Sequence, residues 1–479
     1  MRQLTINDAI EAEKELCRRS FAYFIRRAWP HIIPDALKWN WHIDAIAEHM
    51  EAVRRGEILR LLINIPPGTS KSTITGVMFP AWLWGPGGEP GARIIGASHE
   101  QGLAIRDNRN TRELITSEWY AKRWAVRLTS DQNEKLYFEN DKKGFRQACA
   151  VASMTGRRGH YVLWDDPLSP EKAHSEQHRK TAIRVFSETL PTRLNDPTRS
   201  AIVVVMQRLH DDDISGHILR SDLGYEHLCI PMEFEPDRRK TTSIGWTDPR
   251  TKEGELLDPV RFPPEVIARD KAAMGTYGWA GQMQQRPAPA GGGIFRDEWW
   301  QYYRVPPTIK WRGIYGDTAQ KTKEQNDYSV FQCWGYSSDG KAVLLDQIRG
   351  KWEAPELLTT AKAFWTKHKA VQGMGSLRHF KIEDKSSGTG LIQSMKKGGE
   401  PIPVAGIPRE TDKVTRAYDA APYIEAGRVM IPESAPWLSD YLAEFRSFPN
   451  GSHDDQIDPT MDAIKDMLGG NQYSLDNVL

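Results

Sequence analysis

The stretch at residues 59–73 constrains the fold of this chain more than any other. An apolar run, Leu61 to Ile65, ends in a Pro-Pro-Gly turn and is followed by Lys71-Ser72-Thr73, which can open a helix. This order predicts a strand, a loop and a helix. Such a loop can bind phosphate, because its N–H groups and the helix dipole attract an anion there. We expect Lys71 to reach the β- and γ-phosphates and Ser72, with Thr73 as the alternative, to hold Mg²⁺.

The glycine pattern of this loop is incomplete. In the G-x-x-x-x-G-K-[ST] motif the glycine before the lysine is Ser70 here, and the first glycine is Ile65. A βα turn with a solvated lysine explains the stretch equally well when it is taken alone. If the loop binds a nucleotide, Ser70 takes the place of the glycine. The residues expected around the phosphates are Gly68, Thr69, Ser70, Lys71, Ser72 and Thr73.

Two further apolar strands are expected to end beside this loop. Residues 161–164 run into Asp165 and Asp166, and residues 200–206 run into Gln207. Open α/β sheets bind ligands at the carboxyl ends of their strands. Asp165 is therefore predicted to hold the metal, Asp166 to orient or activate the hydrolytic water, and Gln207 to sense the γ-phosphate. A turn at Asp-Asp-Pro and a capped helix start are the alternatives without function.

A glycine-flanked pair of arginines, Arg157 and Arg158, precedes the strand that ends at Asp165. An arginine on such a loop can stabilise charge that develops on a γ-phosphate. The same side chains can instead contact DNA phosphates or have no function.

Composition excludes some classes of protein and leaves others open. The 479 residues include 64 basic and 63 acidic side chains, so the net charge of +1 neither supports nor excludes nucleic acid. The four cysteines have neither C-x-x-C pairing nor zinc spacing. The N-terminus is charged and no apolar run approaches membrane length, so a cytoplasmic protein without membrane contact is expected.

The second half of the chain follows a different pattern, which begins after a Pro- and Gly-rich linker at residues 284–293. An apolar run delivers Asp317, and residues 327–334 and 342–345 alternate around a Ser-Asp-Gly turn, which predicts a β-hairpin. A helix, a strand that ends on acids and later helices complete an RNase H-like order. We expect three regions: a P-loop domain at 1–235, a lid and linker at 236–293, and an RNase H-like domain at 294–479.

Acidic residues from separate elements of this second half are expected to meet at one sheet edge. They are Asp317, Glu383 or Asp384, and Asp454 or Asp455. Each acid alone is better explained as a helix cap or a turn. Together they would repel one another, because like charges raise one another's pKa. Two Mg²⁺ or Mn²⁺ ions about 3.5–4 Å apart would neutralise them, activate a water and stabilise the leaving oxygen of a phosphodiester.

Both halves together resemble the large terminase subunit of tailed double-stranded DNA bacteriophages. The resemblance rests on the order of several segments: PPGTSKS at 66–72, VLWDD at 162–166, VVVMQRLH at 203–210, QQRP at 284–287, GIYGDTA at 313–319 with the later Asp327, IEDKSSGTG at 382–390, and HDDQID at 453–458. It implies an α/β protein with an N-terminal P-loop (ASCE/RecA-like) ATPase domain and a C-terminal RNase H-like nuclease domain.

The resemblance also implies roles for individual residues. ATP and Mg²⁺ are then bound by Lys71, Ser72 and Asp165, while Asp166 stands where the family usually has a catalytic glutamate, a departure that leaves its role open. Arg158 looks like the family's arginine finger. The implied acids of the nuclease metal site are Asp317, Asp327, Glu383 or Asp384, and Asp454 or Asp455, with Lys413 and Arg416 near DNA.

The function that the resemblance implies is a viral DNA-packaging motor. ATP hydrolysis would drive duplex DNA into a procapsid, and a two-metal endonuclease would cut the concatemer. A small terminase subunit, a portal protein and a ring of motor subunits are the implied partners, in the host cytoplasm at the portal and outside the mature virion. The alternatives are a nucleic-acid remodelling ATPase whose RNase H-like domain does not cut, and a nucleotide-gated scaffold.

Overall fold

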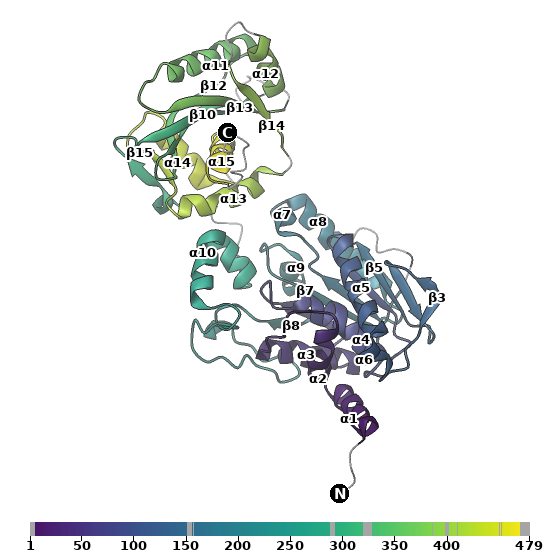
Figure 1. The fold of residues 1–479 in the computed structure, drawn as a ribbon. Coiled ribbons are helices and arrows are strands. Elements are labelled where there is room, and N and C mark those ends of the chain that lie inside the picture. Colours follow the sequence, from purple (N-terminus) through teal and green to yellow (C-terminus); the bar gives the residue numbers. More distant parts are fainter. Residues whose placement is uncertain are drawn as a thin grey trace. The chain divides into compact units, whose positions relative to one another are not determined.

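The chain divides into two compact units in the computed structural model (Figure 1). Unit 1 comprises residues 1–271 and 277–289, and unit 2 comprises residues 272–276 and 290–479. The structure describes residues 5–150, 156, 158–287, 293–319, 328–385, 387–397, 402–409, 411–449, 451 and 453–469. No helix in these ranges is long and apolar enough to cross a membrane.

Unit 1 is built around a sheet whose strands lie in the order β3-β4-β5-β2-β6-β7-β1-β8. The strands are β1 (Arg60–Asn64), β2 (Ile94–Ser98), β3 (Leu128–Asn133), β4 (Tyr137–Asn140), β5 (Phe145–Ala150), β6 (Tyr161–Asp165), β7 (Ala201–Met206) and β8 (Glu226–Cys229). From β5 to β8 all neighbours are parallel, whereas β3 and β4 extend the sheet antiparallel. Every residue of β7 is buried, as a central parallel strand requires.

Helices before, between and after these strands complete the unit. They are α1 (Ile6–Arg19), α2 (Phe21–Ala28), α3 (Trp41–Arg55), α4 (Phe79–Trp84), α5 (Gln101–Thr116), α6 (Glu118–Ala121), α7 (Pro170–Ala173), α8 (Glu176–Arg184) and α9 (Ile214–Arg220), while α10 (Pro264–Gly278) spans the division between the units. The π-helical segment η2 (Thr73–Met78) follows the predicted phosphate loop and leads into α4. The predicted order of strand, loop and helix is confirmed.

Unit 2 contains a sheet in the order β14-β13-β10-β11-β12-β15-β9. Its elements are β9 (Gln301–Tyr303), β10 (Ile309–Asp317), β11 (Ser329–Ser337), β12 (Ala342–Gly350), α11 (Ala354–Lys369), β13 (Ser376–Glu383), α12 (Ser387–Lys397), β14 (Val404–Ile407), α13 (Lys413–Glu425), β15 (Val429–Pro432), α14 (Leu438–Ser447) and α15 (Ile457–Leu468). The strands β10, β11 and β12 form an antiparallel meander, and β13 adds parallel to β10. The predicted hairpin and the RNase H-like order are confirmed.

Helices cover both faces of this second sheet (Figure 1). Side chains of α11 and α12 pack with Ile314 on one face, and side chains of α13, α14 and α15 pack with Tyr315 on the other. Neighbouring residues of β10 enter different cores because side chains alternate along a strand. The helices on the two faces hold the sheet in place, and with it the acids at the ends of its strands.

Candidate nucleotide site and candidate metal centre

The loop between β1 and η2 is held in a strained conformation that glycine normally adopts. Gly68 has φ 76° and Ser70 has φ 65°, so both lie in the left-handed region. A Cβ on Gly68 would lie 3.3 Å from Phe262 Cζ. Thr69 donates its hydroxyl to the carbonyl of Pro66 at 2.8 Å, and His42 Nε2 lies 3.2 Å from the carbonyl of Thr69. Ser70 thus takes the conformation of the glycine that the motif lacks.

Replacing Ser70 by glycine is expected to raise the free energy of unfolding by about 0.5–1 kcal/mol. Relief of the left-handed strain is worth about 1–2 kcal/mol, and the added chain entropy of glycine offsets about half of it. Chemical denaturation measures the change, and nucleotide binding should persist. Lys122→Gly is the matched control, because Lys122 has φ −70° and should lose stability instead. A destabilised Ser70→Gly protein would contradict the strained loop.

The carboxyl ends of β6, β7 and β1 bring the predicted nucleotide residues to one edge of the sheet. Lys71 is 5% exposed, and its Nζ lies 3.3 Å from Asp166 Oδ1. Within the described residues, three buried atoms here have no hydrogen-bond partner: Lys71 Nζ, Asp165 Oδ1 and Gln207 Oε1. Buried polar atoms are nearly always paired, so three of them at one strand edge indicate a site for a polar ligand. They fit a nucleotide with its Mg²⁺, which would be bound by phosphate contacts and carboxylate oxygens.

The backbone of the loop is also available to an anion. The N–H groups of Ser70, Lys71 and Ser72 make no hydrogen bond to an acceptor in the part of the chain that the structure describes. Consecutive free N–H groups before a helix form an anion-binding concavity. The expectation that loop N–H groups remain free for phosphates agrees with this geometry.

Two adjacent carboxylates lie opposite Lys71. Burial, with a contribution from Asp166, raises the pKa of Asp165, while Lys71 and the hydroxyl that Ser72 donates to Asp165 oppose the rise. Asp166 has φ 39°, donates its N–H to the carbonyl of Val205, and accepts at its own carbonyl from His99. A buried carboxylate whose charge is so poorly compensated by the protein fits a bound cation.

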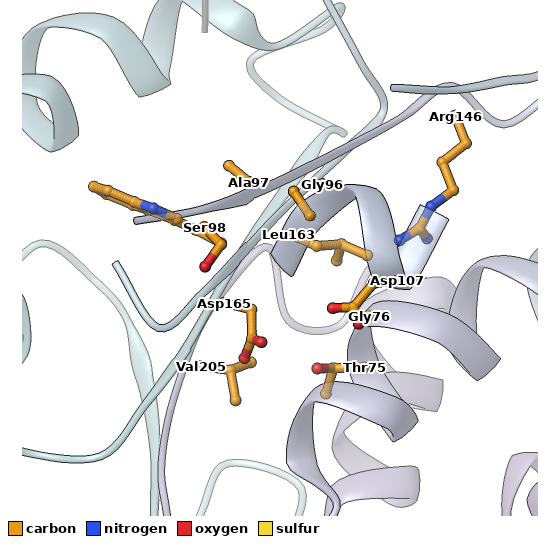
Figure 2. Close-up of a pocket in the computed structure, with 12 residues that line it drawn as sticks. Thr75, Gly76, Gly96, Ala97, Ser98, Asp107, Arg146, Leu163, Asp165 and Val205 are labelled. Atoms are coloured by element: carbon orange, nitrogen blue, oxygen red, sulfur yellow. The ribbon is translucent and has the colours of Figure 1, made fainter. Parts of the chain in front are cut away.

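A small cavity adjoins Asp165 on the side of β2 and α5 (Figure 2). It measures about 10 Å³, which is room for one water molecule. Ser98 Oγ and Arg146 Nη1 border it as buried atoms without a hydrogen-bond partner among the described residues, and Asp107 lies between Arg146 and Thr75. The cavity extends the polar environment of Asp165 into the interior of unit 1.

Arg158 lies apart from Lys71 and Asp165. It is exposed and precedes β6, whereas Asp165 ends that strand. An extended strand of this length holds its two ends more than about 13 Å apart. Arg157 lies outside the described residues. Arg158 is thus not brought to the nucleotide loop of its own chain, and any contact with a γ-phosphate would have to be made in another subunit.

In unit 2 the structure brings three carboxylates together at the edge of the sheet. Asp317 ends β10, Glu383 ends β13, and Asp458 lies in the first turn of α15. One oxygen from each lies within 4.8 Å of the others. Strands β10 and β13 are paired in parallel, so their carboxyl ends coincide. Carboxylate oxygens at this spacing suit Mg²⁺ or Mn²⁺.

Basic side chains approach the same cluster. Lys413 Nζ lies 2.9 Å from Asp458 Oδ2, Arg409 Nε lies 3.3 Å from Glu383 Oε2, and Arg416 makes a short ion pair with Asp458. Burial raises the pKa of Asp458, but these three cations outweigh it and hold that pKa below its usual value.

The cluster acts differently on Asp317. Burial raises the pKa of Asp317 to about 7, Lys413 opposes the rise, and Asp458, Glu383 and Asp455 add to it. Burial lowers the pKa of Lys413, but the surrounding carboxylates outweigh it and keep the ammonium charged. The site therefore retains surplus negative charge around Asp317, which a divalent cation would compensate.

The structure does not place the other expected acids in this cluster. Asp384 follows the last residue of β13, is exposed and accepts a hydrogen bond from the Thr389 hydroxyl. Asp454 pairs with Lys413, and Asp455 pairs with Arg349, since both precede the first turn of α15. Of the two alternatives at 383 and 384, the geometry favours Glu383. Asp327 lies outside the described residues.

Asp458 is the member of the cluster that we did not select from the sequence. It is 2% exposed and lies in α15 among the buried residues Ile457 and Met461. A carboxylate in the apolar stripe of an amphipathic helix was the available signal, because burying an unpaired charge is unfavourable. Its spacing of four residues from Asp454 placed it on the same helix face but did not show which acid faces the sheet.

Comparisons with known proteins agree with this architecture. Residues 314–466 match the family model of the terminase RNaseH-like domain. Among solved structures, the large terminase from a thermophilic bacteriophage aligns with a TM-score of 0.52 at 10% identity, over 88% of this chain and 98% of that one. The same protein in complex with ATP-gamma-S aligns with a TM-score of 0.50 at 11% identity, over 87% and 98%. No curated protein sequence matches the chain.

These matches confirm the resemblance and the fold class that it implies. The chain has the fold of a large terminase, with a P-loop ATPase fold in unit 1 and an RNase H-like fold in unit 2.

Proposed function

We propose that this chain, with a large-terminase fold and a terminase RNaseH-like domain at residues 314–466, is an ATP-driven viral DNA-packaging motor that also cuts DNA. The observation that carries the proposal is the presence in one chain of two sites. Unit 1 has a phosphate loop with a buried Lys71 Nζ that has no hydrogen-bond partner among the described residues, and unit 2 has the cluster Asp317, Glu383 and Asp458. Packaging combines two activities, nucleotide hydrolysis and phosphodiester cleavage, and each of the two sites suits one of them.

In unit 1 the chain's own residues would bind and orient the nucleotide. Mg²⁺, when bound, neutralises charge on the phosphates. Ser72 and Asp165 offer the oxygen ligands for it, and Lys71 would place its charge beside the β- and γ-phosphates. Asp166 would orient the attacking water. Gln207 follows β7, the strand between β1 and β6, and would contact the γ-phosphate. Arg158 would act on the nucleotide of a neighbouring subunit.

In unit 2 the three clustered carboxylates would hold a divalent ion. A bound ion activates water and stabilises charge on the leaving oxygen of a phosphodiester. Lys413 and Arg416 lie next to these acids and would attract the backbone of duplex DNA. Contacts to phosphates carry no sequence information, so cutting should depend little on sequence and binding should weaken steeply with salt.

The large-terminase fold further supports a set of partners. They are double-stranded DNA, a small terminase subunit that selects it, and the portal protein of a procapsid, with this chain arranged as a homo-oligomeric ring in the host cytoplasm during packaging.

The proposal is tested with the purified full-length chain in two assays. One follows ATP hydrolysis with and without duplex DNA, and the other follows nicking of a supercoiled plasmid with Mn²⁺. ATP hydrolysis together with nicking supports the packaging motor. Hydrolysis without any metal-dependent nicking would point to a remodelling ATPase with a non-cutting RNase H-like domain, and absence of hydrolysis would contradict the motor.

A further inference from the structure

A buried network of polar side chains ties the start of α15 to the sheet and to α14 in unit 2. Its six members are each at most 5% exposed: Gln332, Gln347, Tyr441, Glu444, Gln456 and Thr460. Their chain neighbours Phe445, Ile457 and Met461 belong to the apolar core. Polar groups are costly to bury, whereas a fully paired network holds one arrangement of the elements that it joins.

Every polar group of Gln456, the residue before α15, has a partner in this network. Its backbone N–H donates to Glu444 Oε1 and its side-chain Nε2 donates to Glu444 Oε2, both at 2.6 Å. Its carbonyl accepts from Gln332 Nε2 at 3.1 Å, and its Oε1 accepts from Gln347 Nε2 at 2.5 Å. The first anchor of α15 is therefore fixed on β11, β12 and α14 together.

Thr460 provides a second anchor one turn further along the helix. Its Oγ1 lies 3.0 Å from Gln332 Oε1 and 2.9 Å from the hydroxyl oxygen of Tyr441. Gln332 is itself oriented by Trp334, whose Nε1 donates to Gln332 Oε1 at 2.9 Å. Residues four apart share one face of a helix, so the two anchors fix the rotation of α15 about its axis as well as its position.

The metal-cluster acid Asp458 lies between the two anchors in the sequence. It projects from the other side of the helix, about 200° from Gln456, and reaches Asp317 and Glu383 within 4.8 Å. A side-chain oxygen about 5–6 Å from the axis moves by about 2 Å when a helix turns by about 20°. Metal–oxygen distances tolerate only about 0.2 Å, so a small rotation of α15 would take Asp458 out of the ligand set.

We propose that this buried network, with Gln332 and Gln456 at its centre, positions Asp458 for metal binding by fixing the rotation of α15. The inference rests on the proposed nuclease function and assigns Gln332, which lies in the core of the sheet, as a positioning residue. The network acts through the backbone of the helix, and Gln332 itself does not contact the ion. Supports of this kind decide whether a ligand set is held tightly enough to bind.

Mn²⁺ binding tests the inference without an activity measurement. The electron paramagnetic resonance signal of free Mn²⁺ gives the dissociation constant of the full-length chain without nucleotide. Each protein is compared with the same protein carrying Asp317→Asn, so that only binding at the cluster is counted. Gln332→Met keeps the size of the side chain and removes its hydrogen bonds. It should weaken Mn²⁺ binding at least about tenfold, because loss of an outer support of a metal ligand typically costs about 10- to 100-fold in affinity.

A kinetic measurement separates this positioning role from a general loss of structure. In plasmid nicking, the Mn²⁺ concentration that gives half of the maximal rate should rise about tenfold in Gln332→Met, in step with the dissociation constant. The rate at saturating Mn²⁺ should stay within about threefold of the wild type, because a bound ion draws Asp458 back into place.

Two further variants show whether the effect belongs to the network. Tyr441→Phe removes only the hydroxyl that contacts Thr460, and it should weaken Mn²⁺ binding about threefold, as expected for one hydrogen bond. Leu357→Ala is the matched control, because Leu357 is 4% exposed and packs in the core on the other face of the sheet. It should lower the melting temperature and leave Mn²⁺ binding unchanged.

The outcomes distinguish failure of this inference from failure of the proposed function. Unchanged Mn²⁺ affinity in folded Gln332→Met, or in Tyr441→Phe should Gln332→Met not fold, would overturn the positioning role. An equal loss of affinity in Leu357→Ala would overturn it too, since any loosening of unit 2 would then suffice. If Asp317→Asn removes no bound Mn²⁺ from the wild type, the proposed nuclease itself fails.

Discussion

Replacing Lys71 by methionine should lower the rate of ATP hydrolysis about 10²- to 10³-fold, the usual loss when one fixed charge-stabilising donor is removed from an active site. Lys71 Nζ is buried at the carboxyl end of β1, has no hydrogen-bond partner among the described residues and pairs only weakly with Asp166 at 3.3 Å. Methionine keeps the length of the side chain and removes the charge. Turnover of ATP measured by phosphate release reports the loss.

The controls for this prediction come from the same unit. Lys122→Met removes an exposed lysine that pairs with Glu118 on α6, and it should leave hydrolysis unchanged. Thermal unfolding separates loss of function from loss of fold: an ATP analogue with Mg²⁺ should raise the melting temperature of the wild type but barely that of Lys71→Met. Unchanged turnover in Lys71→Met would overturn the nucleotide site.

The fold was largely predictable because local patterns and global topology agree. The apolar run at β7 and the run before Asp165 are continuous, which suits strands buried on both faces of a parallel sheet. The two strand-forming runs of β11 and β12, joined by a short turn at Gly340, are typical of a hairpin. The strand order could not be read from the sequence, because it depends on long-range pairing such as that of β1 with β7.

The candidate sites were predictable only where one element carries the signal. Lys71 and Asp165 follow directly from strand ends, and the left-handed φ of Ser70 explains how the loop closes without its glycine. The choice between Glu383 and Asp384 depends on where β13 ends, because Glu383 is its last residue and Asp384 lies beyond it. Predicting the position of Asp458 requires the rotation of α15 about its axis. Predicting the contacts of Lys413 requires the packing of α13 against α15. These are tertiary facts that spacing along the chain does not contain.

Replacing Asp317 by asparagine should lower plasmid nicking in Mn²⁺ by at least about 10³-fold. The reason is that a catalytic metal supplies several kcal/mol of charge stabilisation, and each 1.4 kcal/mol is a factor of ten in rate. Asp317 is the acid of the cluster that no described side chain engages in an ion pair, so its oxygens are the freest to bind the ion. Asp384→Asn should keep cutting, because Asp384 contacts Thr389 and lies outside the cluster. Equal product from the wild type and Asp317→Asn would contradict the nuclease.

The same substitution should stabilise the metal-free protein at alkaline pH, which shows that the inactive variant is folded. The pKa of Asp317 is about 7 in the native state against an ordinary 3.8, so between these values the unfolded chain binds fewer protons than the native state. Stability therefore falls as pH rises through this window, and the loss is complete above about pH 7. Asparagine carries no charge to bury and avoids the loss.

Thermal unfolding in EDTA measures this difference between Asp317→Asn and the wild type. At pH 8 the variant should unfold at a higher temperature, and its free energy of unfolding should exceed that of the wild type by up to about 4 kcal/mol, while the two should converge near pH 4. Added Mn²⁺ should reverse the order at pH 8, because only the wild type gains stability from an ion bound among Asp317, Glu383 and Asp458. A variant that is less stable than the wild type in EDTA at pH 8 would show that Asp317 is already compensated by protein cations, and the surplus negative charge that calls for a metal would be absent.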